Sequence, residues 1–411
     1  MGLSGWVLAG LLGAWGIEAL ASHLQRRALA RPVPEELAAS YDAERLERAR
    51  AYGRARNRLG QCARAAQLAA LLGFWALDGF AWLAGLLEAR VSQELLRGAL
   101  YIGALAAAGR LCGLPFRLWS TFGVEARFGF NRTTPRTFLA DQLKGAALSI
   151  ALGGPLLCGL LWIVQRFGAD AWPWAWLGLT LWSLALQFVA PRWIMPLFLR
   201  FEPLPAGPLR SRLTACAERA GFPLADVYVV DGSRRSAHAN AFFTGFGRTR
   251  RVALFDTLVQ RHGEDEVEGV LAHEIGHWKL GHIPRGIALS LATSALWLWA
   301  FAWASESAAL HRAFGLDAPA PATGLVLLSI LAGPLQLVLG VAGSWISRRH
   351  EYQADAFAAR VTGAPRALAD ALLRLASDSL APPAPHALHT ALFASHPPLA
   401  ERVRALRQAR P

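Results

Sequence analysis

Charged residues are scarce in this sequence. Only 17% of its 411 residues are Asp, Glu, Lys or Arg, whereas 54% are hydrophobic and the mean hydropathy is +0.29. A water-soluble chain of this length would need a larger polar surface to cover its two or three domains. The shortage of charge therefore argues against a soluble enzyme and indicates an integral membrane protein.

Cysteine is also rare, and several common functional motifs are missing. The four cysteines are scattered and form no CxxC pair, so we expect them to be small buried hydrophobic residues in a reducing compartment. The sequence has no Walker-type or dinucleotide-binding loop, and no basic segment is interleaved with aromatic residues. We therefore expect no nucleic acid as a partner.

Long apolar runs, in contrast, are abundant. A run of about 20 apolar residues is long enough for a helix to cross a bilayer. We predict seven membrane spans, at residues 3–22, 64–87, 97–118, 146–167, 172–191, 285–305 and 324–346. The first run has no basic flank and no small-residue cleavage site, so we expect it to remain as a span. The 16 Trp residues fit anchors at the two membrane surfaces.

The net charge of +13 is explained by the arrangement of the spans. Nearly all Arg residues outside the spans fall in the first, third and fifth connections and in the C-terminal tail, which seven crossings place on one side. The positive-inside rule makes that side cytoplasmic and brings the basic residues to the anionic headgroups of the lipid bilayer. The bias toward Ala, Leu, Gly and Arg suggests a bacterial source, and hence an inner membrane.

The chain divides by composition into four parts. We expect residues 1–200 to form a membrane region with about five spans, in which a solvated helix at the membrane surface separates the first two. Residues 201–284 are expected to form the largest water-facing segment, residues 285–346 two further spans, and residues 347–411 a second water-facing segment at the C-terminus. The alternation in VYVVDGS predicts a strand, and ANAFFTGFGRTRRVALFD predicts a hairpin that turns near residues 245–250.

The stretch LAHEIGHWKLGH contains an HExxH motif. On a helix, His273 and His277 project from the same face and can share a metal ion, while Glu274 lies beside them as a general base. The flanking apolar residues argue against two ordinary surface histidines. His282 lies five residues beyond His277, about 140° around the helix, so we expect it to be a local cap or a surface residue.

A hydrolytic zinc site needs a third protein ligand and one open position. The best candidate is Glu351 in RRHEYQADAFA, with Asp355 one helical turn later as a hydrogen-bond acceptor for a ligating imidazole. His350 and Asp355 are alternative ligands, and Glu351 could instead be a solvated helix charge. In SHPPLAERVRAL, His396 and Arg402 are candidates to stabilise an oxyanion.

These motifs together are similar to one known family. LAHEIGHWKLGH, RRHEYQADAFA, FGFNRTT, RVALFDTLV and SHPPLAER resemble, in the same order, the type I CAAX prenyl endopeptidases, which are integral-membrane zinc proteases related to the HtpX-like proteases. The resemblance implies a predominantly α-helical membrane protein in which about seven helices surround an aqueous chamber, with a zincin-like catalytic domain that contains a small β-hairpin.

The resemblance also implies roles for individual residues. His273, His277 and Glu351 would bind one Zn²⁺, Glu274 would be the base, and Asp355 would support a ligand. His396 and Arg402 would sit near the substrate or the oxyanion. Asn240, Ala241 and Phe242 would pair with an extended peptide or protein substrate, which is prenylated in some members of the family.

Two other functions remain open from the sequence. An HtpX-like quality-control protease would use the same chemistry, but the FGFNRTT region and the number of spans favour the CAAX type. A non-catalytic membrane scaffold or transporter with a structural metal would need a closed fourth coordination position. No further His or Cys with suitable spacing is visible in the sequence.

Overall fold

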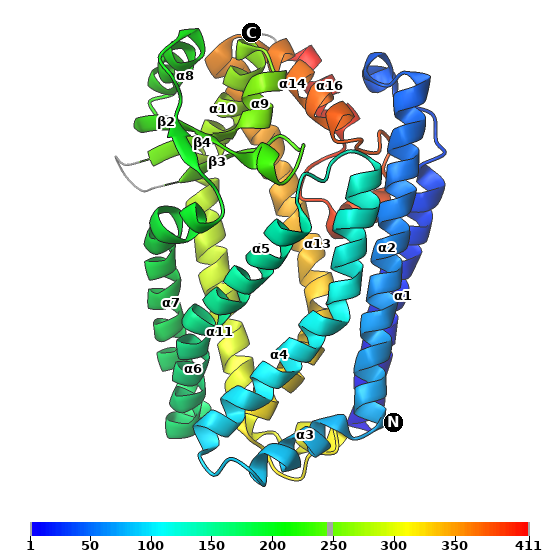
Figure 1. Ribbon diagram of the computed structural model, residues 1–411, viewed down its shortest axis with the longest axis vertical. Helices are drawn as coiled ribbons and strands as arrows, with labels where there is room; N and C mark the ends of the chain where they lie inside the picture. Colours follow the sequence, from blue (N-terminus) through cyan, green and yellow to red (C-terminus); the bar gives the residue numbers. More distant parts are fainter. Residues whose placement is uncertain (1, 245–249, 410–411) are drawn as a thin grey trace.

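The computed structural model describes residues 2–244 and 250–409. It is an elongated helical protein with a small mixed sheet at one end (Figure 1). The helices of the elongated part are α1 (Leu3–Ala28), α2 (Ala43–Ala76), α3 (Gly79–Glu88), α4 (Glu94–Leu118), α5 (Pro135–Leu148), α6 (Gly154–Phe167), α7 (Trp172–Val189), α11 (His282–Glu306), α12 (Ala308–Ala313) and α13 (Pro321–Thr362).

The remaining elements gather around the sheet end of the molecule (Figure 1). The strands are β1 (Phe201–Pro203), β2 (Leu224–Val230), β3 (Ala241–Thr244) and β4 (Arg250–Phe255). The helices of this end are α8 (Pro208–Arg219), α9 (Asp256–Arg261), α10 (Glu264–Lys279), α14 (Pro365–Asp378), α15 (Ala387–Phe393) and α16 (Leu399–Gln408).

The predicted class of fold, a helical protein with several membrane spans, is confirmed. Within the described residues, five helical stretches are long and apolar enough to cross a membrane, or six when the bent pair of α2 and α3 is counted as one span. One of the five, residues 135–197, contains both α6 and α7. These two helices are joined by a turn at Gly168, which has a positive φ of 53°, and they pack against each other, so this stretch folds back on itself.

The structure corrects two of the predicted elements. The expected surface helix and the start of the second span form one continuous helix, α2, and the span predicted at 64–87 is broken at Leu77 and Asp78, where α3 turns away by 63°. Helix α13 likewise runs for 42 residues, so the seventh span and the RRHEYQADAFA helix are a single rod. A helix can continue where its side chains change from apolar to polar, because its backbone hydrogen bonds form within the helix whatever surrounds the side chains.

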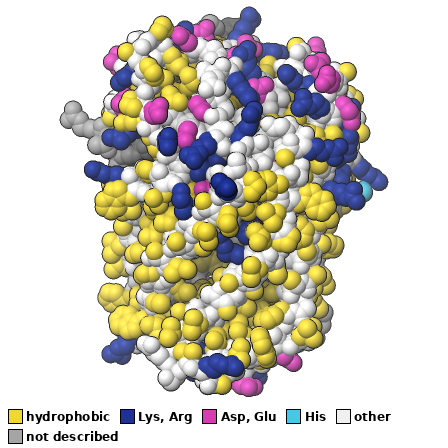
Figure 2. Space-filling model, viewed as in Figure 1, with side chains coloured by type: hydrophobic (Ala, Val, Ile, Leu, Met, Phe, Trp, Pro, Cys, Tyr) yellow, Lys and Arg dark blue, Asp and Glu magenta, His cyan; other side chains and the backbone are white. Residues whose placement is uncertain are grey.

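The spans enclose an open interior. At most 22% of the residues in the apolar window of each of the five stretches are buried, so most of their side chains face the surroundings or the interior. The buried apolar residues of the described chain form two clusters, one around α10 and the sheet and one around α3, α12 and the far ends of α4 and α11. Figure 2 shows a broad apolar belt with a hollow within it, below a charged end. Two cores with exposed helices between them agree with the predicted chamber.

The cysteines on the span helices are poorly buried, like most other side chains there. Only Cys216, in α8, is buried, whereas Cys62 and Cys112 on the span helices are exposed and Cys158 is half-buried. The expectation of buried cysteines was therefore wrong for those on the spans. Their helices expose more than one face, to the belt or to the interior, and small apolar side chains there have few neighbours.

The sheet has β3 as one of its two edge strands. Its order is β1-β2-β4-β3, with β2 and β4 parallel and β3 antiparallel to β4. The predicted strand is β2, and the predicted hairpin is confirmed by the pairing of Ala241 with Leu254. Its turn falls mostly in residues 245–249, outside the described residues. Because β3 is the last strand in the order, one side of its backbone is available to another strand.

Candidate metal centre

Helix α10 is held in place by favourable ends and a close contact. Three acidic residues occupy its first turn, where they stabilise the positive end of the helix dipole, and Glu266 accepts a hydrogen bond from the backbone N–H of Gly263 at 3.3 Å. Val267, Leu271 and Ile275 are fully buried on its inner face. At Gly276 a Cβ atom would lie 3.1 Å from the Cα of Ala354, so the glycine permits α10 to approach α13 closely.

This approach brings three predicted residues together. The Nε2 atoms of His273 and His277 are 3.3 Å apart, and the carboxylate of Glu351 lies 3.6 Å from the first and 3.3 Å from the second. All three ligand atoms lie within 4.8 Å of one another, and they form the one such cluster among the described residues. His350 is not part of it. Two nitrogens bound to one ion at about 2.0–2.1 Å with tetrahedral angles would be about 3.3–3.4 Å apart, so the donors fit zinc.

A second ring of side chains fixes these donors. Asp355 Oδ1 lies 2.8 Å from His273 Nδ1, on the opposite side of the ring from Nε2. Arg402 donates two hydrogen bonds to Asp355, at 2.8 and 2.7 Å, and its third nitrogen lies 3.2 Å from Glu351. Burial opposes the charge of Arg402, but its hydrogen bonds to Asp355 hold its pKa above the ordinary value. All three guanidinium nitrogens of Arg402 therefore contact the carboxylates of Asp355 and Glu351.

The other predicted polar residues also reach the centre. His396 Nδ1 lies 2.6 Å from Glu351, and 63% of its side chain is exposed, so it faces open space as well as the cluster. The carboxyl of Glu274 is half-buried beside the histidines. Burial raises the pKa of Glu274 above its ordinary value, although the nearby His273 and His277 oppose this shift. A raised pKa suits a group that must accept and release a proton near neutral pH.

His282 differs from its prediction. It is 5% exposed, so it is no surface residue, and its Nδ1 lies 3.1 Å from Nδ1 of His277. The reason is Gly281, whose φ of 72° ends α10 and redirects the chain, so that the position of His282 is not set by a continuous helix. A periodic count around one helix could not have found this contact.

The partner of His282 fixes the tautomers of two rings. His282 Nε2 lies 2.9 Å from Gln353 Oε1, so this nitrogen carries the proton that it donates to the amide oxygen. The unprotonated Nδ1 of His282 then accepts a hydrogen bond from His277 Nδ1–H, which leaves the lone pair of His277 Nε2 facing the cluster. The sequence did not predict this role for His282, and it gave no role to Gln353, whose only signal is that it follows Glu351 by two residues.

The residues predicted to meet a substrate lie at the start of β3, a strand that contacts α10. Asn240 is exposed, and its backbone carbonyl accepts a hydrogen bond from Phe255 N–H at 2.9 Å. Ala241 and Phe242 pair with Leu254 and Ala253 of β4 on their inner side. Helix α10, which carries the HExxH residues, packs on β3.

Family models match nearly the whole chain. Residues 23–200 match the model described as CAAX prenyl protease N-terminal, five membrane helices, and residues 203–410 match Peptidase family M48. The chain is 36% identical over 342 residues to the CAAX prenyl protease 1 homolog of Arabidopsis thaliana, which covers 82% of this chain and 80% of that protein. It is 34% identical over 374 residues to the CAAX prenyl protease 1 homolog of Homo sapiens, with 81% and 78% covered.

A solved structure is similar over its full length. The crystal structure of S. mikatae Ste24p superimposes with a TM-score of 0.93 and 31% sequence identity, and the match covers 99% of each chain. The helical arrangement and the catalytic end described above are therefore shared with that protein.

The contact at Gly276 predicts a sharp difference between two glycines. Gly276→Ala would push its methyl group against the backbone of α13, and should lower stability by about 1–3 kcal/mol and weaken zinc binding. Gly286→Ala in α11, where a Cβ meets nothing within 4 Å, serves as the control and should leave both quantities unchanged or improve stability. Thermal unfolding and zinc titration of the purified proteins measure this, and equal effects of the two substitutions would contradict the role of the contact.

The hydrogen bonds that run from Gln353 through His282 to His277 predict that Gln353, which contacts no metal ligand, affects zinc affinity. Gln353→Leu removes the acceptor of His282 and should lower zinc affinity about 10-fold or more, as loss of supporting hydrogen bonds commonly does. His350→Phe is the control, because His350 stacks flat on His282 at 3.9 Å without a hydrogen bond to it. Competition with a chelating dye measures the affinities. Unchanged affinity in Gln353→Leu would show that the chain does not orient His277.

Proposed function

We propose that this chain, which belongs to the CAAX prenyl protease 1 group of the M48 peptidase family, cuts its substrate at the centre formed by His273, His277 and Glu351. It is a membrane-embedded metalloendopeptidase. The observation that carries this proposal is the convergence of these three donors with Glu274 beside them, next to a free strand edge. Two imidazoles and one carboxylate suit Zn²⁺ and leave a position open, as hydrolytic zinc sites require.

Zinc, when bound, supplies Lewis acidity that activates water and polarises the scissile carbonyl. Within this scheme, His273 and His277 present Nε2 lone pairs because Asp355 and His282 face their Nδ1 atoms. Arg402 holds both Glu351 and Asp355 in position through its buried guanidinium. The protein thus arranges its donors before the ion arrives.

Glu274 carries the proton in the proposed reaction. Its carboxylate takes a proton from the attacking water and then delivers it to the amine that leaves. The charge that develops on the carbonyl oxygen needs a donor. His396 is suited to this role, because Nδ1 faces Glu351 while the ring is largely exposed, so its Nε2 remains for the substrate. Arg402 lines the same cavity as His396 and adds positive charge nearby, while its three nitrogens remain on Asp355 and Glu351.

An extended peptide would bind along β3. Backbone groups of Asn240, Ala241 and Phe242 on the free edge would form hydrogen bonds with it, as in other cases of strand addition. We propose that the substrates are CAAX-type prenylated peptides or other membrane-associated peptides. The names of the relatives and their coverage of this chain support the first class over an HtpX-like quality-control protease.

The catalytic end is proposed to face the cytoplasm. The basic side chains gathered at the end that carries the sheet and the metal centre support this orientation, because positive residues remain on the cytoplasmic side (Figure 2). The composition supports an inner-membrane location in a bacterium, and the relatives named above are eukaryotic.

The assignment of Glu274 is tested by Glu274→Gln. This change keeps the shape of the side chain but removes its basicity, so kcat should fall by about 10²–10⁴-fold while one zinc ion per chain is retained. Peptidase assays with elemental analysis give both values. Full activity in the variant would contradict the proposed mechanism, and loss of zinc would place Glu274 among the ligands instead.

Recognition of a prenyl group is tested with two peptides of identical sequence, one farnesylated on cysteine and one not. We expect a higher kcat/KM for the farnesylated peptide, because its chain can use the apolar interior and belt of the spans. A non-farnesylated peptide with the cysteine alkylated by a short polar group serves as the control. Equal cleavage of all three would remove the prenyl group from the proposed function.

A further inference from the structure

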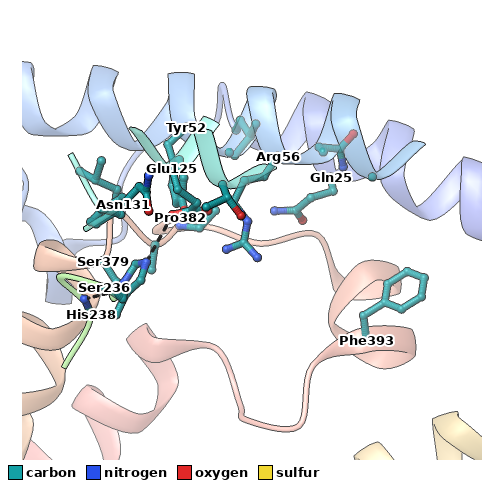
Figure 3. A pocket seen from close by; sticks show the side chains of 18 of the residues that line it. Gln25, Tyr52, Arg56, Glu125, Asn131, Ser236, His238, Ser379, Pro382 and Phe393 are labelled. Carbon is teal, nitrogen blue, oxygen red and sulfur yellow. Dashed lines mark hydrogen bonds and ion pairs between the residues drawn. The ribbon is translucent and has the colours of Figure 1, made fainter. Parts of the chain in front are cut away.

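Two cavities of the protein share the side chain of Arg235. The larger, of about 1020 Å³, lies between α1, α2 and the segment around Ser236, and within it Glu125 lies 3.6 Å from His238 (Figure 3). The second, of about 430 Å³, lies between α5 and residues 196–200. Arg235 is part of both walls, so the second cavity adjoins the first.

The wall of the second cavity is strongly basic. Its charged side chains are five cations and one carboxylate, namely Arg136, Lys144, Arg200, Arg234, Arg235 and Asp141. The carboxylate is already paired, because Arg235 donates two hydrogen bonds to Asp141, at 2.9 and 3.1 Å. This pair accounts for one of the five cations and leaves four others around the same small space.

Within the described chain, these four cations form no ion pair with a carboxylate. Lys144 donates a hydrogen bond to the backbone carbonyl of Leu197 at 2.8 Å, which is a neutral acceptor. The side chains of Arg136, Arg200 and Arg234 are exposed. Like charges around one cavity repel one another, and an anion placed between them removes that cost.

The position of the cavity along the chain places it at the membrane surface. The stretch of residues 135–197, which folds back on itself, is long and apolar enough to enter a membrane. Both ends of this stretch line the cavity, and the bond from Lys144 to Leu197 joins them. Arg200 and Arg234 come from the end that carries the sheet. Figure 2 shows Lys and Arg side chains gathered at this level, where the apolar belt meets the charged end.

Exposed apolar side chains lie next to the basic wall. Leu197 lines the cavity itself and is 48% exposed. Helix α5 exposes Leu139 and Leu143, at 59% and 63%, and each directly precedes a residue that lines the cavity. A ligand at this place therefore meets cations at one end and apolar surface beside them. This combination suits a phospholipid better than a small soluble anion.

We propose that this cavity binds the headgroup phosphate of an anionic phospholipid from the membrane leaflet on the catalytic side. Guanidinium groups bind phosphate oxygens through parallel hydrogen bonds, and basic pockets between membrane helices commonly hold anionic headgroups. The acyl chains would lie along the exposed leucines of α5. A zwitterionic lipid fits less well, because its own cation would meet Arg136, Arg200 and Arg234. The site is independent of the peptidase function proposed above.

A bound lipid would also connect separate parts of the fold. Its phosphate would join α5 to the turn at Arg234, which leads through residues 235–240 into β3. A ligand that binds only the folded state stabilises it. Anionic lipid should therefore raise the temperature of unfolding of the full-length protein.

The test is native mass spectrometry of the full-length protein in mild detergent, titrated with phosphatidylglycerol or with phosphatidylcholine of the same acyl chains. Phosphatidylglycerol should bind about 100-fold more tightly, because each of the three exposed arginines contributes about 5-fold. Arg234→Gln should lower its affinity about 5-fold. The triple change of Arg136, Arg200 and Arg234 to Gln should remove the preference between the two lipids, and with it the thermal stabilisation by phosphatidylglycerol.

Arg349→Gln is the matched control. Arg349 is exposed and follows the apolar part of α13, but it does not line this cavity. The substitution changes the net charge as Arg234→Gln does, and the affinity for phosphatidylglycerol should stay at the wild-type value.

Three results would overturn the proposal. One is equal affinity of the wild-type protein for the two lipids. Another is an equal loss in Arg349→Gln and Arg234→Gln, which would assign the attraction to the overall charge of the protein. The third is displacement of phosphatidylglycerol by inorganic phosphate at equal concentration, which would make the cavity a site for a soluble anion. Because Arg234→Gln changes one exposed side chain, it decides the question even where the triple variant does not fold.

Discussion

The close contact of α10 with α13 is the constraint on which the metal centre depends. The two histidines come from one helical turn and need no folding beyond that turn, but Glu351 comes from a helix that is remote in sequence. Gly276 against Ala354 sets the separation of the two helices, and Glu351 is then within 3.6 Å of both imidazoles. Arg402 and Asp355 add a buried ion pair that holds the glutamate and one histidine in fixed orientations.

The arrangement of the long helices also accounts for the hollow interior. Apolar cores at the two ends tie the long helices together. Helix α13 passes through this region as a continuous rod and carries the third donor from the spans to the catalytic end. Polar side chains on the spans, such as Arg56 and Arg64, face a cavity and avoid the cost of exposure to lipid. The chamber and the centre are consequences of one arrangement of helices.

The sequence predicted the local parts of this arrangement well. The HExxH spacing requires only helical geometry, and the hairpin follows from the alternation of side chains in β3 and β4. Contacts between distant segments were harder, because periodicity carries no information across a break. Asp78 and Gly281 adopt positive φ values that redirect the chain, which ended the second span early and placed His282 against His277. The pairing of Arg402 with Asp355 was equally invisible, since α16 is remote from α13 in sequence.

The most direct measurement of the central claim is zinc K-edge X-ray absorption of the zinc-loaded protein, compared with its His277→Ala variant. The account predicts nitrogen and oxygen ligands at about 2.0–2.1 Å, including two imidazoles in the wild-type protein and one in the variant, with no sulfur. Sulfur ligation at about 2.3 Å, or two imidazoles that persist in the variant, would contradict a centre built from His273, His277 and Glu351.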